Sequence, residues 1–410
     1  MGSSFPRSFW WGTGASSTQC EGAAPASDWI PWERAGRAPP SGSGNDFATR
    51  YAGDFKLLAD HGLRHHRLSI EWARIEPREG QRDAAAVDHY RQVLRTAKES
   101  GIEPWVCLHH FTLPAWFAAQ GAFIDDSVRE RYWRRHVAFC AETFGDLVFG
   151  WKPINEPVAY AAAGYLLGVN PPGERDFGKL FEAYRGILLA QRDAWVGLRG
   201  GGRPVATIHN LSPVFPAVDT DAARAAAHTV DDIIWGVWMR AEREGVLTLP
   251  GRDPEHVADL RQACDLIGFS YYSALGIAED TTFKPYPPGA RVGPLGYCPW
   301  SDGIDLVLRR LHAELPDRRS WSANTASARR QRRKTTSGAA KFYAARCSTS
   351  VTPCAMASTY AGSFIGPLST TTSGTSATTL RSDCSHATGS RAAVRQSWPS
   401  MQAADDSKRR

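Results

Sequence analysis

The stretch Trp151-Lys-Pro-Ile-Asn-Glu-Pro157 places an amide and a carboxylate side by side, directly before a proline. We interpret Val148–Ile154 as a short strand that ends at these polar residues. In a barrel built from alternating strands and helices, catalytic groups project from the C-terminal ends of the strands. Glu156 is therefore a candidate general acid, and Asn155 a candidate neutral hydrogen-bond donor. The open alternative is a surface glutamate at an ordinary strand-to-helix turn.

Outward from this stretch, short strand-like runs alternate with longer segments that have apolar residues at helical spacing. This alternation is typical of repeated βα units around a parallel sheet, and it predicts a (β/α)8 TIM barrel with about six units recognisable. The other expected strands are Phe9–Ala15, Arg64–Ile70, Glu103–His110, Val205–His209 and Asp265–Tyr272. The expected helices are Phe47–His61, Ala84–Ser100, Val128–Phe144 and Phe177–Arg199.

The pattern changes after Pro316, where the sequence becomes rich in Ser, Thr, Ala and Arg and loses its apolar periodicity. We therefore divide the chain into an incomplete barrel over residues 1–316 and a low-complexity, disordered tail over residues 317–410. The Arg-rich run at 329–334 could be a nucleic-acid or targeting patch. We favour the simpler interpretation that it belongs to the low-complexity tail and binds no nucleic acid.

Composition narrows the class of protein further. The chain has 15 tryptophans, which favours aromatic-walled clefts that stack on sugar rings, although most tryptophans in any protein lie in the core. Its eight cysteines form no Cys-x-x-Cys pair, so neither a disulfide framework nor a metal site is expected. No apolar stretch approaches the roughly 18 residues of a membrane span, and no secretory leader is evident. We expect a cytoplasmic protein that needs no cofactor.

Six motifs, in order along residues 5–316, resemble those of the family 1 β-glycosidases, the β-glucosidase type. Asn155-Glu156-Pro157 is similar to the acid/base motif of that family. The other five similar stretches are Phe9-Trp-Trp-Gly-Thr-Gly-Ala-Ser-Ser-Thr-Gln-Cys-Glu-Gly22, Arg67-Leu-Ser-Ile-Glu-Trp-Ala-Arg-Ile75, Leu108-His-His-Phe-Thr-Leu-Pro114, the loop with Gly164-Tyr165, Gly168 and Pro171-Pro-Gly173, and Asp265-Leu-Ile-Gly-Phe-Ser-Tyr-Tyr272.

The resemblance implies a role for each matching side chain. Gln19, His110 and Asn155 would bind the sugar, and Glu156 would be the general acid/base. Arg67 and Tyr272 would support the nucleophile, the first by keeping it ionised and the second by a hydrogen bond. The chain departs from the family pattern at three positions, which are Thr18, Phe111 and Ser270.

Retaining hydrolysis needs a second carboxylate about 5–5.5 Å from the first, and the family carries it on the seventh strand. This chain has no Glu after Glu314. A shift of one base from Arg319 onward permits Val-Val-Val-Gly-Glu-His-Gly-Ile-Gly, which resembles the missing strand, and the same shift from Cys354 to Gly374 permits a stretch like the eighth strand. We therefore hypothesise that the C-terminal quarter is out of frame.

The resulting expectation is a retaining β-glycosidase that acts on terminal β-D-glucosides or galactosides and has lost its nucleophile, so that the chain as written is inactive. The alternatives are a non-catalytic sugar-binding remnant and a pseudogene product. The expected partner is a small β-glycoside or oligosaccharide, with neither nucleic acid nor membrane. The sequence does not predict the oligomeric state.

Overall fold

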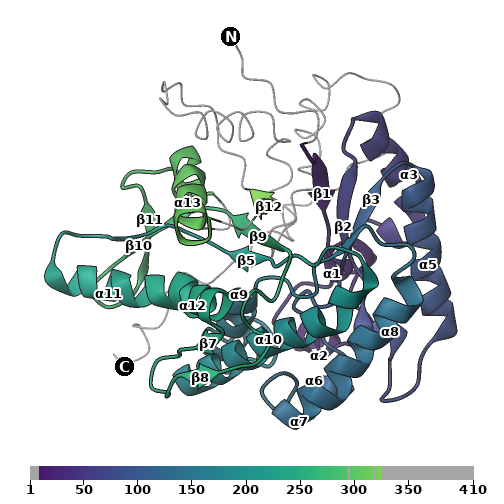
Figure 1. Cartoon of the computed structure of the whole chain (residues 1–410), viewed down its shortest axis with the longest axis horizontal. Coiled ribbons are helices and arrows are strands. Elements are labelled where there is room, and N and C mark those ends of the chain that lie inside the picture. Colours follow the sequence, from purple (N-terminus) through teal and green to yellow (C-terminus); the bar gives the residue numbers. More distant parts are fainter. Residues whose placement is uncertain (1–8, 294–295, 317–318, 326–410) are drawn as a thin grey trace.

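The computed structural model describes residues 9–293, 296–316 and 319–325. Its central feature is a series of parallel strands that follow one another in chain order (Figure 1). Strands β1, β2, β3 and β4 pair in that order, and isolated bridges from Trp151 to Val205 and from Ala206 to Leu266 carry the pairing on to β5 and β9. The strands of this series are β1 (Gly12–Gly14), β2 (His65–Ser69), β3 (Glu103–Cys107), β4 (Gly150–Trp151), β5 (His209–Asn210), β9 (Leu266–Tyr271) and β12 (Arg319–Thr325).

Helices connect successive strands and lie on the outside of the series, which is the arrangement of a β/α barrel (Figure 1). The predicted helices and most of the predicted strands are confirmed, with differences at their ends. Two predicted strands are much shorter in the structure: Val148–Ile154 is reduced to β4, and Val205–His209 overlaps β5 only at His209, with Val205 and Ala206 in isolated bridges. The helices are α1 (Ser17–Glu21), α2 (Trp29–Arg34), α3 (Phe47–Asp60), α4 (Trp72–Ile75), α5 (Ala84–Glu99), α6 (Ala115–Ala119), α7 (Asp126–Val128), η1 (Arg129–Trp133), α8 (Arg134–Phe144), α9 (Pro157–Ala161), η2 (Ala162–Leu166), α10 (Phe177–Leu198), η3 (Arg199–Gly201), α11 (Asp221–Asp231), η4 (Asp232–Gly236), α12 (Val237–Glu244) and α13 (Ser301–Glu314).

Two small sheets lie outside the main series. In the first, β10 pairs in parallel with β6 and antiparallel with β11. In the second, β7 and β8 form an antiparallel pair. These strands are β6 (Val214–Pro216), β7 (Val246–Leu247), β8 (Glu255–His256), β10 (Ala274–Ile277) and β11 (Phe283–Tyr286).

Helix α5 shows how the sequence determines an element of the outer layer. Asp83 caps its first turn, because the side chain accepts a hydrogen bond from the amide of Ala86 at 3.0 Å. Tyr90, Val93 and Leu94 are fully buried, and their spacing puts them on one face of the helix. That face packs toward the strands. All five residues of β2 are buried, as expected for a strand that is covered on both sides.

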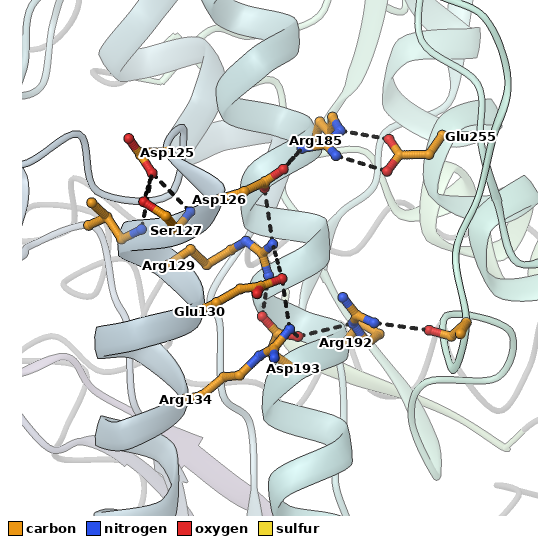
Figure 2. A network of polar contacts seen from close by, with 12 residues as sticks. Asp125, Asp126, Ser127, Arg129, Glu130, Arg134, Arg185, Arg192, Asp193 and Glu255 are labelled. Atoms are coloured by element: carbon orange, nitrogen blue, oxygen red, sulfur yellow. Dashed lines mark hydrogen bonds and ion pairs between the residues drawn. The ribbon is translucent and has the colours of Figure 1, made fainter.

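Charged side chains connect the outer helices η1 and α10 (Figure 2). Arg129 and Asp193 form an ion pair in which both side chains are only 2% exposed. Arg129 also contacts Asp126 at 3.0 Å, and Arg134 contacts Asp193 at 3.1 Å. Because a buried charge is stable only with a partner, this pair fixes the position of the two helices relative to each other.

The prediction that the chain is disordered from residue 317 onward is wrong for one stretch. Arg319–Thr325 form β12, which pairs in parallel with β9 over most of its length, with an irregularity between Ser322 and Asn324. The edge of β9 presents unpaired backbone groups, and such an edge can pair with a chain of any side-chain composition. Residues 326–410, the rest of the predicted tail, lie outside the described residues.

Three further findings concern only the described part of the chain. No helix there is long and apolar enough to cross a bilayer. In the same residues, no group of three or more His, Cys, Asp or Glu side chains is arranged to hold a metal ion. The described cysteines are all buried, and burial raises the pKa of the Cys20 thiol to about 12.

Candidate active site

The predicted site residues all lie at one edge of the strand series. Gln19 is in α1, which follows β1, and Arg67 is the central residue of β2. His110 follows β3, Glu156 follows β4, and Tyr272 follows β9. Because the strands are parallel, their C-terminal ends meet at the same mouth of the barrel. The fold therefore brings together residues that are up to 253 positions apart in the sequence, from Gln19 to Tyr272.

Glu156 is the centre of this group. Its side chain is 2% exposed and accepts hydrogen bonds from the Tyr272 hydroxyl at 3.2 Å and from the Asn210 amide at 3.3 Å. Burial raises the pKa of Glu156, while Ser270, Arg67, Tyr272 and Asn210 oppose the rise by favouring the charged form. A carboxyl group with a raised pKa holds its proton to a higher pH than an exposed glutamate does, which suits it to act as a proton donor.

The backbone of Glu156 helps to direct this side chain. It has a left-handed conformation, with φ 50° and ψ 68°, which is uncommon for a residue with a side chain and often marks a functional site. Its amide donates to the carbonyl oxygen of Ile208 at 2.8 Å. Pro157 then begins α9, a position that suits proline because its missing N–H would have no partner there.

Asn155 and Arg67 lie next to Glu156. Arg67 donates to the Asn155 side-chain oxygen at 2.6 Å, and this bond leaves the amide nitrogen of Asn155 pointing elsewhere. That nitrogen is buried and has no hydrogen-bond partner among the described residues. A buried donor without a partner is costly, so this atom is suited to a ligand hydroxyl.

Gln19 and His110 occupy the neighbouring part of the mouth. The side-chain oxygen of Gln19 is buried and, within the described ranges, accepts no hydrogen bond. His110 is 6% exposed and packs edge-on against Phe111, with ring centroids 5.2 Å apart. The two loops meet where Thr18 donates to Thr112 at 3.4 Å.

Asn210 is a site residue that the sequence reasoning missed. It follows the predicted strand Val205–His209 directly, as Glu156 follows its own strand. The rule that located Glu156 therefore applied to Asn210 as well. Tyr272, which the resemblance assigns to the support of the nucleophile, donates a hydrogen bond to the acid/base candidate Glu156.

The position of the second carboxylate is the main departure from a complete site. The seventh strand of the series, β12, has the sequence Arg-Ser-Trp-Ser-Ala-Asn-Thr and carries no acidic residue. Another buried carboxylate, Glu71, stands two residues after the end of β2. Its oxygens already accept hydrogen bonds from Ser17, Thr112 and the amide of Ala73, so it is not available for attack on a sugar.

Comparison with known proteins agrees with this geometry. The family model described as glycosyl hydrolase family 1 matches residues 1–288. The 6-phospho-beta-glucosidase GmuD of Bacillus subtilis is 27% identical, covering 75% of this chain and 75% of that protein. Coniferin beta-glucosidase of Pinus contorta is 28% identical, covering 68% of this chain but only 62% of that protein.

Among solved structures, a beta-glycosidase from Pyrococcus horikoshii superposes with a TM-score of 0.73 at 27% identity, covering 79% of this chain and 77% of that one. The agreement in sequence and in strand order extends across the elements that carry Gln19, Arg67, His110, Glu156 and Tyr272. This chain belongs to glycosyl hydrolase family 1.

Proposed function

We propose that the site is that of a retaining β-glycosidase, with Glu156 as the general acid/base and with Gln19, His110 and Asn155 as contacts to a terminal β-D-glucose or galactose unit. The observation that carries this proposal is the environment of Glu156. It is buried, its pKa is raised, and it accepts hydrogen bonds from Tyr272 and Asn210 at the mouth of the barrel.

The chemistry follows from a carboxyl group in this state. A protonated Glu156 would donate to the bridging oxygen as the glycosidic bond breaks, while a second carboxylate would attack the anomeric carbon. The resulting glycosyl-enzyme would then be hydrolysed by water, with Glu156 acting as base. Arg67 and Tyr272 are proposed to support the attacking carboxylate in a complete family member.

In the chain as written, the attacking group is missing, because no Glu follows Glu314. We therefore propose that this chain binds the sugar without turning it over. An out-of-frame C-terminal quarter would explain the loss, and reading the gene across codons 310–330 decides between this origin and a different one. The two relatives named above include both a β-glucosidase and a 6-phospho-β-glucosidase, so a phosphorylated sugar is a second substrate class to test.

The test is a pair of measurements on the purified 410-residue chain. Isothermal titration with glucoimidazole should show saturable binding that Gln19→Ala weakens, while Gln92→Ala, an exposed glutamine on α5, leaves it unchanged. An aryl β-glucoside should be hydrolysed no faster than in buffer. Turnover at an ordinary enzymatic rate would refute the proposal that the nucleophile is missing. Absence of any binding would refute the proposal that the site binds a sugar.

A further inference from the structure

Glu71 holds two parts of the barrel mouth together through a single oxygen atom. It lies between β2 and α4, where it is the N-terminal cap of α4, and is 4% exposed. Its Oε2 accepts hydrogen bonds from the Ser17 hydroxyl at 2.6 Å and from the Thr112 hydroxyl at 2.9 Å. Its other oxygen accepts from the amide of Ala73 at 3.4 Å.

The two hydroxyl partners belong to the two loops that carry the proposed sugar contacts. Ser17 begins α1, two residues before Gln19. Thr112 follows β3 and stands two residues after His110. A single carboxylate oxygen thus connects the loop after β1 with the loop after β3, and the short α4 connects both to the end of β2.

Both hydroxyl groups donate their hydrogen bonds to Glu71, and neither accepts one from it. A carboxylate oxygen only accepts, so both hydroxyl hydrogens must point toward Glu71. Burial raises the pKa of Glu71, and the hydrogen bonds from Ser17 and Thr112 oppose the rise because they favour the charged carboxylate. Hydrogen bonds to a charged acceptor are stronger than those between neutral groups, and burial keeps water from competing for them. Close to Gln19 and His110, the direct contact between the two loops, from Thr18 to Thr112 at 3.4 Å, is long by comparison. The shorter bonds between these loops lie farther along the chain, from the Asp28 amide to the Leu113 carbonyl at 2.9 Å and from the Ala115 amide to the Ala26 carbonyl at 2.8 Å.

We infer that Glu71 is a positioning residue that acts through Ser17 and Thr112 to hold Gln19 and His110 at the spacing that a sugar ring requires. The inference rests on the proposed function and adds a residue that touches no substrate itself. This role explains why a carboxylate is buried at this position at a cost in desolvation, although a neutral Ser or Thr could cap α4.

The test measures the dissociation constant of glucoimidazole for the full chain by isothermal titration. Glu71→Leu removes both bonds and should weaken binding by at least tenfold. Glu71→Gln keeps an oxygen that can accept from both hydroxyls, so it should restore much of the affinity. Ser17→Ala and Thr112→Val should each weaken binding roughly tenfold or less, the loss expected for one hydrogen bond.

Glu76 provides a matched control. It is also a buried carboxylate, at the other end of α4, and it accepts hydrogen bonds from the Trp72 ring at 3.1 Å and from the amide of Gly80 at 2.7 Å. Glu76→Gln should lower the thermal midpoint without changing the dissociation constant. An equal loss of affinity in Glu76→Gln would overturn the inference, because it would show a general structural effect.

Two other outcomes also decide the question. If Glu71→Leu does not fold, unchanged affinity in both Ser17→Ala and Thr112→Val would overturn the inference. If Glu71→Leu folds and binds as tightly as the unmodified chain, the inference is overturned directly. Failure of the unmodified chain to bind glucoimidazole would instead count against the proposed function, so the two failures are distinguishable.

Discussion

Replacing Glu21 by glutamine should change how the stability of the barrel depends on pH. Glu21 lies in α1, is buried, and accepts a hydrogen bond from Tyr90 at 2.9 Å. Burial raises the pKa of Glu21 from its ordinary value of 4.5 to about 7, although Tyr90 and Arg74 oppose the rise. The folded chain therefore holds a proton on this group over a pH range in which the unfolded chain has released it.

The sign and the size of the effect follow from this difference in pKa. Below pH 4.5 both states are protonated and the folded state carries no penalty. Stability is lost as the pH rises from 4.5 to 7 and then stays constant, because both states are then ionised. At about 1.4 kcal/mol per pKa unit, the total loss is about 3 kcal/mol, an order-of-magnitude figure. Glutamine cannot ionise, so Glu21→Gln removes this loss and keeps an acceptor for Tyr90.

The assay is urea-induced unfolding of the unmodified chain and of Glu21→Gln at pH 5 and pH 8. Relative to the unmodified chain, the variant should gain about 2–3 kcal/mol in unfolding free energy between pH 5 and pH 8. Glu142→Gln, at an exposed position of α8, is the control and should show no such gain. An equal difference between Glu21→Gln and the unmodified chain at the two pH values would refute the reasoning.

Two further predictions concern other buried charges. Tyr272→Phe removes a hydrogen-bond donor to ionised Glu156, so the pKa of Glu156 should rise further. Titration of the carboxylic-acid infrared band of Glu156, which Glu156→Gln identifies, measures this pKa. An unchanged or lowered pKa would contradict the prediction. Asp193→Ala leaves Arg129 buried without its main partner (Figure 2), so the free energy of unfolding should fall by about 3 kcal/mol in a denaturant titration. A loss under about 0.5 kcal/mol would contradict this, because it would show that Asp126 alone is enough to stabilise the charge of Arg129.

The sequence was most informative where periodic burial and parallel strands act together. The rule that catalytic groups follow the ends of parallel strands predicted Glu156, and the resemblance to family 1 implied Tyr272; the structure places these two side chains in contact. The bond from Asn210 to Glu156 was not predicted, although Asn210 directly follows a predicted strand and the strand-end rule could have identified it.

Other features depend on tertiary geometry that no periodicity reveals. Strand β12 lacks the apolar pattern of a barrel strand, and its pairing depends on the open edge of β9. The role of Glu71 likewise depends on Ser17 and Thr112, which are 54 and 41 positions away in the sequence. Long-range hydrogen bonds of this kind can be found only once the strands are arranged in space.

A crystal structure of the 410-residue chain bound to glucoimidazole would test the central claim most directly. We predict that the sugar ring lies at the barrel mouth, with its hydroxyls bonded to Gln19 Oε1 and Asn155 Nδ2 and with the Glu156 carboxyl group beside the imidazole nitrogen that replaces the bridging oxygen. A ligand bound elsewhere, with these three side chains as they are in the free chain, would contradict the account.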